Sequence, residues 1–197
     1  MDFPINIELD KFKIAVIGGG KVAYRKCVTL LEFTENITVI SNSFIDEFNY
    51  IKDRITIIED NYREKYIKEV NLVIASTNNR NINYKIGVYC NDNNKLVNVV
   101  DNKEISNFNF CSYIKKGDLL IGVSTNGKSP SLSSKIKEEL EEKYDGIEEY
   151  IEILGLIRTE VINNIKDTDE KKLILSSLIR LDLEGLKAEY KKYKKKN

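Results

Sequence analysis

The sequence contains no histidine and no tryptophan, and its three cysteines lie far apart. Without histidine the chain lacks the commonest metal ligand and the commonest general base, so acid–base chemistry falls to carboxylate, lysine, tyrosine or cysteine side chains. Cys27, Cys90 and Cys111 are odd in number and form no C-x-x-C pair, which argues against a disulfide framework or a zinc site. We therefore expect no metal site and three cysteines that serve as small buried apolar residues.

An excess of charge of either sign is also missing, as are long apolar runs. The 31 basic and 31 acidic side chains cancel, which argues against a nucleic-acid or membrane-surface partner. No apolar run approaches the roughly 20 residues that span a bilayer. The first nine residues, MDFPINIEL, lack the basic start and apolar core of a signal peptide. We therefore expect a cytoplasmic protein.

Short apolar runs recur through the first half of the chain, with helical material between them. Their spacing fits βαβ crossovers, and their near-continuous apolar character is typical of strands that helices cover on both faces. The runs cover residues 13–18, 37–41, 55–60, 71–77 and 96–101. The pattern predicts an α/β fold with a Rossmann-type parallel sheet.

The pattern of apolar runs changes after this region. FNFCSYIKKGDLLIGVST predicts two strands around a turn at residues 115–118. From Pro130 the pattern is helical to the end of the chain, with Ser129 as an N-cap and Gly146 as a break. We predict three parts: the Rossmann domain over 1–111, a small region of hairpin and helix over 112–145, and a helical C-terminal domain over 146–197.

The first apolar run leads into the glycine-rich stretch GGGKVA. Gly18, Gly20 and Ala23 match G-x-G-x-x-G/A, the dinucleotide fingerprint, whose glycines let backbone N–H groups approach a pyrophosphate at a helix N-terminus. Lys21 and Val22 begin the expected helix and should flank that pyrophosphate. A single fingerprint of this kind is a weak signal, so the remaining motifs must decide.

The second strand ends without the acidic residue that usually binds the adenosine ribose. Ser41, Asn42 and Ser43 stand there instead, and their neutral groups can still bond the ribose. No adjacent arginine is present for the 2′-phosphate of NADP. Thr77 and Asn78, after the fourth strand, fall where the chain would pass the nicotinamide, although a plain strand-to-helix turn explains them equally well.

Three separated segments carry a family resemblance: VIGGGKVAYRK, VNVVDNKEISNFNF and VSTNGKSPSLSSKIKEELEE. In this order and spacing they resemble the precorrin-2 dehydrogenase family, which also forms the N-terminal part of multifunctional siroheme synthases. The third segment is the most specific, because V-S-T-x-G-K-S-P before a charged helix is not a general Rossmann feature. The resemblance covers residues 1–144.

The resemblance implies an activity and partners. Members of the family oxidise precorrin-2 to sirohydrochlorin with NAD⁺, and some also insert ferrous iron to give siroheme. They have a central dimerisation region, here residues 112–145, so a homodimer is expected. The resemblance favours NAD over NADP. The missing histidine and the short helical tail favour dehydrogenation without iron insertion, which stays open as an alternative.

Asp101 matches the family's functional aspartate, and we expect it to be the catalytic residue. It ends the fifth apolar run, and the carboxyl ends of parallel strands line the crevice where ligands bind. Dehydrogenation separates a hydride from a proton, and the proton needs a base. The alternative is that Asp101 only caps the turn at residues 102–103.

The VSTNGKSP loop also has two interpretations. Ser124, Thr125 and the backbone of Gly127 could bind substrate carboxylates, with Lys128 supplying positive charge. Alternatively, the loop is a glycine turn followed by a helix cap. A non-catalytic NAD(H) sensor could share the Rossmann beginning, but it has no need for both Asp101 and this loop.

Overall fold

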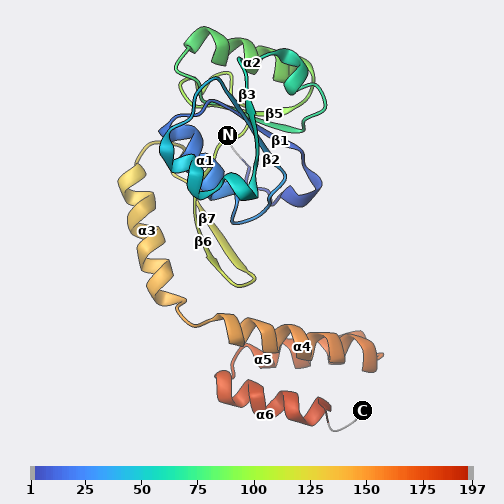
Figure 1. Cartoon of the computed structure of the whole chain (residues 1–197). Coiled ribbons are helices and arrows are strands. Elements are labelled where there is room, and N and C mark those ends of the chain that lie inside the picture. The colour runs from blue at the N-terminus through green and yellow to red at the C-terminus, as the bar shows by residue number, and fades with distance from the viewer. Residues whose placement is uncertain (1–2, 195–197) are drawn as a thin grey trace. The chain divides into compact units, whose positions relative to one another are not determined.

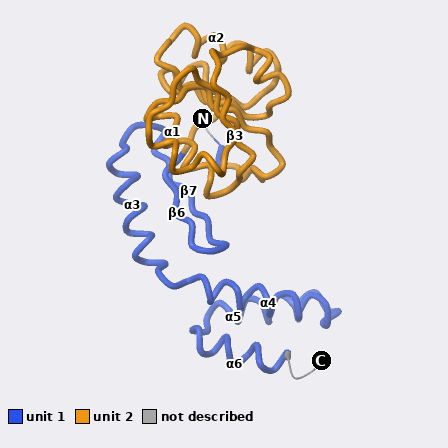
Figure 2. The backbone as a smooth tube through the Cα atoms, in the orientation of Figure 1, with its two compact units in different colours: residues 1–4, 111–197 blue, residues 5–110 orange. Residues whose placement is uncertain are grey.

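The computed structural model describes residues 3–194 and divides into two compact units (Figure 2). One unit comprises residues 5–110. The other begins at residue 111 and also takes in residues 3–4. Each unit is described by itself.

The unit of residues 5–110 is built on a five-stranded sheet in the order β3-β2-β1-β4-β5, with every neighbouring pair parallel. Val16 on the central strand lies opposite Val39 on one neighbour and Ile74 on the other. The predicted parallel sheet is confirmed. The strands are β1 (Ile14–Ile17), β2 (Ile37–Ser41), β3 (Thr56–Glu59), β4 (Leu72–Ala75) and β5 (Leu96–Val99).

Helices α1 (Lys21–Leu30) and α2 (Arg80–Asp92) cover the two faces of this sheet (Figure 1). Successive strand residues point to opposite faces, so β1 contributes to two cores. Val16 packs in the core that includes Cys27 of α1, whereas Ile17 packs in the core that includes Cys90 of α2. Each fully buried aliphatic side chain contributes about 1.5–3 kcal/mol to folding.

Two of the expected helical crossovers are shorter than predicted. Between β2 and β3 the chain forms only 3₁₀ turns, η2 (Asp46–Tyr50) and η3 (Lys52–Arg54), and η4 (Glu64–Tyr66) lies between β3 and β4. Buried Phe48 explains the first case, because its ring packs edge-on against Phe44 and Tyr24 and fills the space a helix would cover. A further 3₁₀ turn, η1 (Leu9–Lys11), precedes β1.

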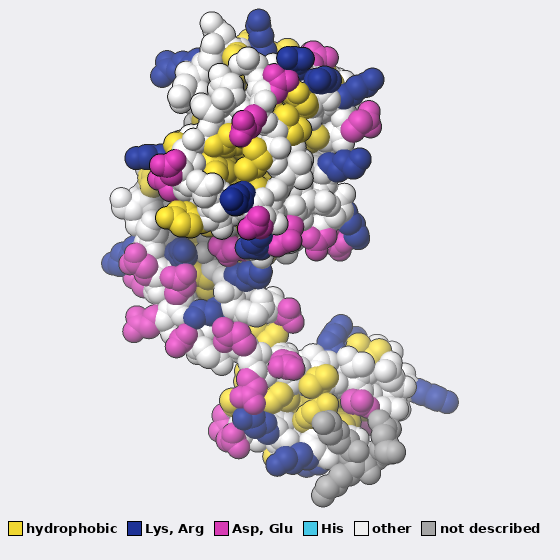
Figure 3. Space-filling view, viewed as in Figure 1, with side chains coloured by type: hydrophobic (Ala, Val, Ile, Leu, Met, Phe, Trp, Pro, Cys, Tyr) yellow, Lys and Arg dark blue, Asp and Glu magenta, His cyan; other side chains and the backbone are white. Residues whose placement is uncertain are grey.

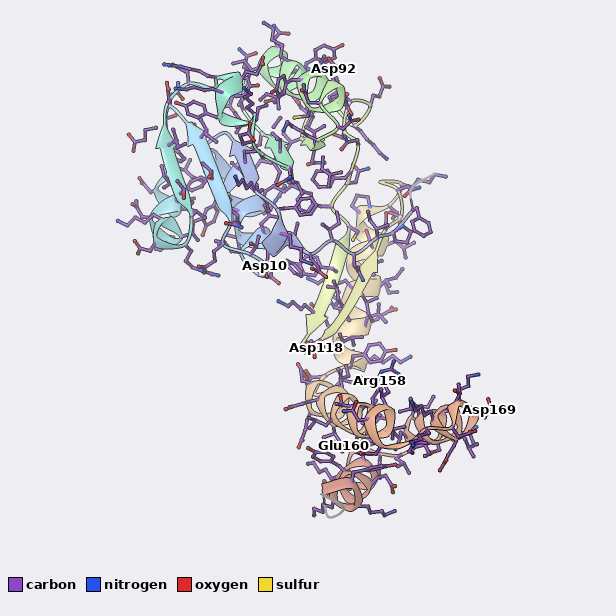
Figure 4. The ribbon with its side chains drawn as sticks, turned by 90° about the vertical axis from the view of Figure 1, so that its right-hand side faces the viewer. Asp10, Asp92, Asp118, Arg158, Glu160 and Asp169 are labelled. Carbon is purple, nitrogen blue, oxygen red and sulfur yellow. The ribbon has the colours of Figure 1, made fainter. Side chains whose placement is uncertain are left out.

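The second unit begins with an antiparallel hairpin of β6 (Ser112–Lys116) and β7 (Leu119–Val123), as predicted. Gly117 adopts a φ of 57° in its turn, and Figure 4 shows Asp118 at the tip. The hairpin packs on α3 (Pro130–Lys143), which Ser129 caps by accepting a hydrogen bond from the Leu132 N–H at 3.3 Å.

Three further helices follow a break at Gly146, whose φ is 71°. They are α4 (Glu148–Asn164), α5 (Thr168–Leu178) and α6 (Leu183–Lys194), and they share a small core around Ile157 and Leu186. The helical pattern was predicted to the end of the chain, and its last residues, 195–197, lie outside the described residues. The division of this unit at residue 146 stays a prediction.

The visible surface carries both signs of charge interspersed on each unit (Figure 3). Such mixing keeps single-sign fields small on that face. None of the helices in the described part of the chain is long and apolar enough to cross a membrane.

Candidate functional site

The strand order places a topological switch point between β1 and β4. The chain moves from β1 through β2 to β3 on one side, and then returns to place β4 and β5 on the other side of β1. In open parallel sheets, ligands bind outside the carboxyl ends of the strands at such a point. The glycines at 18–20 follow β1 and residues 76–78 follow β4, so both predicted cofactor loops flank it.

Each of the three glycines is suited to its position for a different physical reason. A Cβ on Gly18, whose φ is 128°, would lie 2.5 Å from the Ser76 carbonyl oxygen. A Cβ on Gly19 would lie 2.0 Å from the Ser43 carbonyl oxygen. A Cβ on Gly20 would have no heavy atom within 4 Å. The first two glycines therefore let neighbouring loops approach, whereas Gly20 borders open space that a ligand can enter.

The N-terminus of α1 is open to an anion. Gly20 is its N-cap, no side chain caps the helix, and its first turn holds no acidic residue. Lys21 and Val22 in that turn are exposed. Backbone N–H groups and the helix dipole favour a negative group at such an end. These residues fit the pyrophosphate of a dinucleotide.

The residues at the end of β2 are neutral, and Ser41 already makes a hydrogen bond within its own loop. The Ser41 hydroxyl donates to the Ser43 carbonyl oxygen at 2.7 Å, so it closes its own loop. Asn42 and Ser43 are exposed, and the Asn42 amide donates to Asn61 Oδ1 at 3.4 Å. The structure thus leaves two of the three predicted ribose-binding residues accessible.

An acidic residue that sequence reasoning missed lies close by, after β3 instead of β2. The Asp60 N–H donates to the Ser41 carbonyl oxygen at 3.1 Å. The Asp60 carboxylate accepts hydrogen bonds from the Tyr66 hydroxyl and from Arg63. The Tyr66 hydrogen bond is the main cause that lowers the pKa of Asp60. The sequence signal was the acidic end of the ITIIED run.

Thr77 and Asp101 are held by one buried amide, that of Asn83 on α2. The Thr77 N–H and hydroxyl donate to Asn83 Oδ1 at 3.0 and 2.7 Å. Asn83 Nδ2 donates to the Thr77 carbonyl oxygen at 3.0 Å and to Asp101 Oδ1 at 3.2 Å. The structure therefore brings a predicted cofactor residue and the predicted catalytic residue together. Asn78 is exposed in the same loop.

Asp101 lies two residues beyond the end of β5, not within the strand as predicted. Its side chain is 24% exposed, and its Oδ2 lies 4.0 Å from Nε of Arg80. The adjoining turn is bonded by another residue, because the Glu104 N–H donates to Asn102 Oδ1 at 3.1 Å. The hydrogen bond from Asn83 adds a contact that turn capping alone does not need. Both interpretations of Asp101, base and turn cap, stay predictions.

The rest of the second resemblance segment covers the free edge of β5. The Val97 N–H donates to Asn107 Oδ1 at 2.7 Å, and the Asn107 N–H donates to the Val97 carbonyl oxygen at 3.0 Å. The Val99 N–H donates to the Ser106 hydroxyl oxygen at 2.9 Å. These bonds satisfy an edge strand that would otherwise expose unpaired groups. They also fix the segment that carries Asp101.

The predicted substrate loop lies in the other unit and bonds mainly to itself. The Thr125 hydroxyl donates to the Ser129 carbonyl oxygen, and the Ser129 N–H donates to Thr125 Oγ1, both at 3.1 Å. The Ser124 hydroxyl oxygen accepts from the Asn126 N–H at 3.1 Å. Gly127 has a φ of 77°, and Lys128 is exposed. These bonds support the turn-and-cap interpretation, and substrate contact stays a prediction.

The cysteines divide into two classes. Cys27 and Cys90 are buried, and burial raises the pKa of each thiol to about 12. Cys111 is exposed, contrary to the expectation for all three, because it precedes the hairpin instead of lying in the sheet core. Within residues 3–194 no group of three histidine, cysteine or acidic side chains could hold a metal ion.

A surface hollow lies at the opposite end of the sheet. Asn71, Lys95 and Leu96 line it, and these residues stand at the amino ends of β4 and β5. Parallel α/β sheets bind ligands at the carboxyl ends, so this hollow is not the candidate site.

Family models and known relatives agree with this architecture. The model described as "Putative NAD(P)-binding" matches residues 5–112, and the one described as "Sirohaem biosynthesis protein central" matches residues 116–143. A solved structure titled "SirC, precorrin-2 dehydrogenase" has a TM-score of 0.79 and 24% identity, and the match covers 98% of this chain and all of that one. That likeness establishes the fold.

The curated relatives are longer than the segment that this chain matches. The siroheme synthase of Pseudoalteromonas translucida is 33% identical over 140 residues, which is 70% of this chain and 30% of that protein. The siroheme synthase of Neisseria meningitidis serogroup C is 30% identical over 173 residues, 86% of this chain and 36% of that protein. The chain thus spans about a third of the length of these relatives. The resemblance drawn from the three sequence segments is confirmed, and the chain belongs to the putative NAD(P)-binding family.

Proposed function

We propose that this protein is an NAD-dependent dehydrogenase that oxidises precorrin-2 to sirohydrochlorin. One observation carries the proposal: the glycine loop with its open helix N-terminus and the Asp101 carboxylate stand at the same edge of one sheet. The first suits a dinucleotide, and the second suits a base. The siroheme synthase relatives and the SirC title support the choice of substrate.

The cofactor side of the site uses backbone and neutral side chains. The first-turn N–H groups of α1 bind the pyrophosphate, and Gly20 leaves room for it. Asn42 and Ser43 bond the ribose. Arg63 is held by the Asp60 carboxylate at 3.2 Å, so its charge is already balanced, which favours NAD over NADP. When bound, NAD⁺ supplies the hydride acceptor, C4 of its nicotinamide ring.

In this reaction the residues of the chain must accept the proton that the substrate releases. Oxidation of precorrin-2 transfers one hydride to NAD⁺ and releases one proton, which gives sirohydrochlorin and NADH. The partly exposed Asp101 carboxylate accepts that proton. Arg80, whose side chain is 89% exposed beside Asp101, offers a cation to the substrate's carboxylates. Lys128, which is exposed in its loop, is proposed as a further substrate-binding residue.

A homodimer and a cytoplasmic location complete the proposal. The hairpin packs on α3, yet β7 still leaves the side chain of Leu120 exposed. A second copy that pairs with this region, which the central-domain model matches, would stabilise it. Three free cysteines fit a reducing compartment. Sedimentation equilibrium tests the dimer directly.

An anaerobic absorbance assay tests the function. Enzymatically generated precorrin-2 and NAD⁺ are mixed with the protein, and the expected result is sirohydrochlorin and NADH in a 1:1 ratio. Binding of NAD⁺ without either product would contradict the dehydrogenase and indicate a sensor. Ferrous iron added to the same sample tests the bifunctional alternative, since siroheme formed faster than in an enzyme-free control would establish iron insertion as well.

A further inference from the structure

Asn83 is a fully buried polar side chain to which the sequence analysis gave no role. We propose that Asn83 is a positioning residue: it fixes the Asp101 carboxylate so that Oδ2, and not Oδ1, is the oxygen that takes the substrate's proton. The inference rests on the proposed role of Asp101 as the base. It adds a second residue and an oxygen assignment to that role.

The bonds to Thr77 determine which way the Asn83 amide points. A backbone N–H can only donate, so the Asn83 atom that meets the Thr77 N–H at 3.0 Å must be the carbonyl oxygen. The amide nitrogen then faces the Thr77 carbonyl oxygen and Asp101 Oδ1, and both can accept. Each hydrogen of the amide therefore has an acceptor, and no alternative orientation satisfies this set.

This orientation separates the two oxygens of Asp101. Oδ1 accepts the Asn83 hydrogen bond at 3.2 Å, so a proton added there would compete with that bond. Oδ2 lies 4.0 Å from Arg80 Nε, and the side chain is partly exposed there. When Oδ2 takes the proton, Oδ1 becomes the carbonyl oxygen and still accepts from Asn83. The contact with Asn83 thus holds the carboxyl group in place before and after proton transfer.

The same amide couples Asp101 to the loop after β4. Three groups of Thr77, its N–H, its carbonyl oxygen and its hydroxyl, bond to Asn83. The loop proposed to pass the nicotinamide and the proposed base are therefore held at a fixed separation. Hydride and proton leave the same substrate molecule, so this separation governs whether both acceptors reach it.

Part of the role of Asn83 is structural, because it pairs the Thr77 backbone N–H and carbonyl oxygen. Asn83 lies one turn before Ile86 and on the same buried side of α2. Burying an amide costs free energy unless its hydrogen bonds are made, so its presence requires the partners described above. Two of these bonds, with the Asp101 carboxylate and with the Thr77 hydroxyl, go beyond that backbone pairing.

The test replaces the side-chain NH₂ group of Asn83 with an oxygen. Asn83→Asp keeps the acceptor for the Thr77 N–H and hydroxyl, but it replaces the nitrogen that donates to Asp101 and to the Thr77 carbonyl oxygen with an oxygen. Because a displacement of about 1 Å can cost on the order of 100-fold in rate, we expect kcat to fall about 100-fold while the Kd for NAD⁺ stays within about twofold. Wild-type kcat in a folded Asn83→Asp variant would overturn the proposal.

Asn91→Asp is the matched control. Asn91 is also on α2, and its amide donates to the Gly87 and Ile105 carbonyl oxygens at 3.0 and 2.8 Å, so the same exchange removes two hydrogen bonds that do not end on Asp101. We expect kcat within about twofold of the wild type, since surface substitutions away from a site have small effects. An equal fall of kcat in both variants would also overturn the proposal, because it would indicate a general loss of packing.

A second measurement needs no change at position 83 and serves if Asn83→Asp does not fold. In ¹⁵N-labelled protein, Asp101→Ala should shift the side-chain amide signals of Asn83 and leave those of Asn91 unchanged. Unshifted Asn83 signals would contradict the contact. The two proposals fail differently: an inactive wild-type protein contradicts the dehydrogenase, whereas an active wild type with an equally active Asn83→Asp variant contradicts only the positioning role.

Discussion

The starts of α1 and α3 look alike in sequence, yet they differ in what satisfies their backbone. Both follow a glycine-containing loop with a lysine, and both were predicted to bind a ligand. At α1 no side chain caps the helix. At α3 the Ser129 side chain caps the first turn, Pro130 has no N–H, and Thr125 closes the loop with two bonds. At the start of α3, side chains of the loop accept hydrogen bonds from backbone N–H groups, which stabilises the fold. At the start of α1 these N–H groups have no side-chain cap and can bind a ligand.

The largest expected difference between the two units is in how fast their cysteine thiols react. A thiol reagent at about pH 8 should label Cys111 and leave Cys27, on α1, unlabelled, because a pKa of about 12 leaves roughly one Cys27 thiol in 10⁴ ionised and only the thiolate reacts. Mass spectrometry of peptides from the folded protein measures this. Rapid labelling of Cys27 would show that the core behind the glycine loop opens.

Gly20→Ala tests the open start of α1. The added methyl group meets no protein atom within 4 Å, so the fold should accept it, but it enters the space assigned to the pyrophosphate. Overpacking costs about 1–3 kcal/mol, so the Kd for NAD⁺ should rise about 5- to 150-fold. Isothermal titration calorimetry measures this effect.

Gly155→Ala is the control for that experiment. Gly155 lies inside α4, and its added Cβ also meets nothing within 4 Å. It should stabilise the helix by about 0.5–1 kcal/mol without changing NAD⁺ affinity. An unchanged Kd in Gly20→Ala would mean that the α1 start does not hold the cofactor.

Ser129→Ala tests the closed start of α3 and should have the smallest effect. Loss of the bond to the Leu132 N–H should lower the free energy of unfolding by about 1 kcal/mol. NAD⁺ affinity should stay within about twofold, and urea unfolding with parallel titrations measures both. Ser131→Ala, in the same helix, provides the comparison. If Ser129→Ala weakened NAD⁺ binding as much as Gly20→Ala, the two loops would not differ as described.

Local sequence patterns predicted the strands and helix starts whose formation depends on neighbouring residues in the sequence. The β-branched runs identified all five strands of the sheet, and Ser129 with Pro130 marked the start of α3. The crossovers after β2 and β3 were harder to predict, because packing of Phe48 replaces a helix there and leaves no periodic signal.

The site residues were predictable only where a motif stands at a strand end. Gly18 and Asp101 could be located in this way. Asn83 could not, because its partners are 6 and 18 residues away in sequence and meet only when α2 packs beside β5. Asp60 was missed because it follows the neighbouring strand, and only the strand order places it beside Ser41.

The most direct test of the account is turnover and NAD⁺ affinity measured together on Asp101→Ala. Asp92→Ala is the control, since Asp92 ends α2 far along the helix from Asn83 (Figure 4). A general base contributes about 10²- to 10⁴-fold, so precorrin-2 oxidation should fall by at least about 100-fold while the NAD⁺ Kd stays within about twofold. Full activity in Asp101→Ala, or equal losses in both variants, would contradict the account.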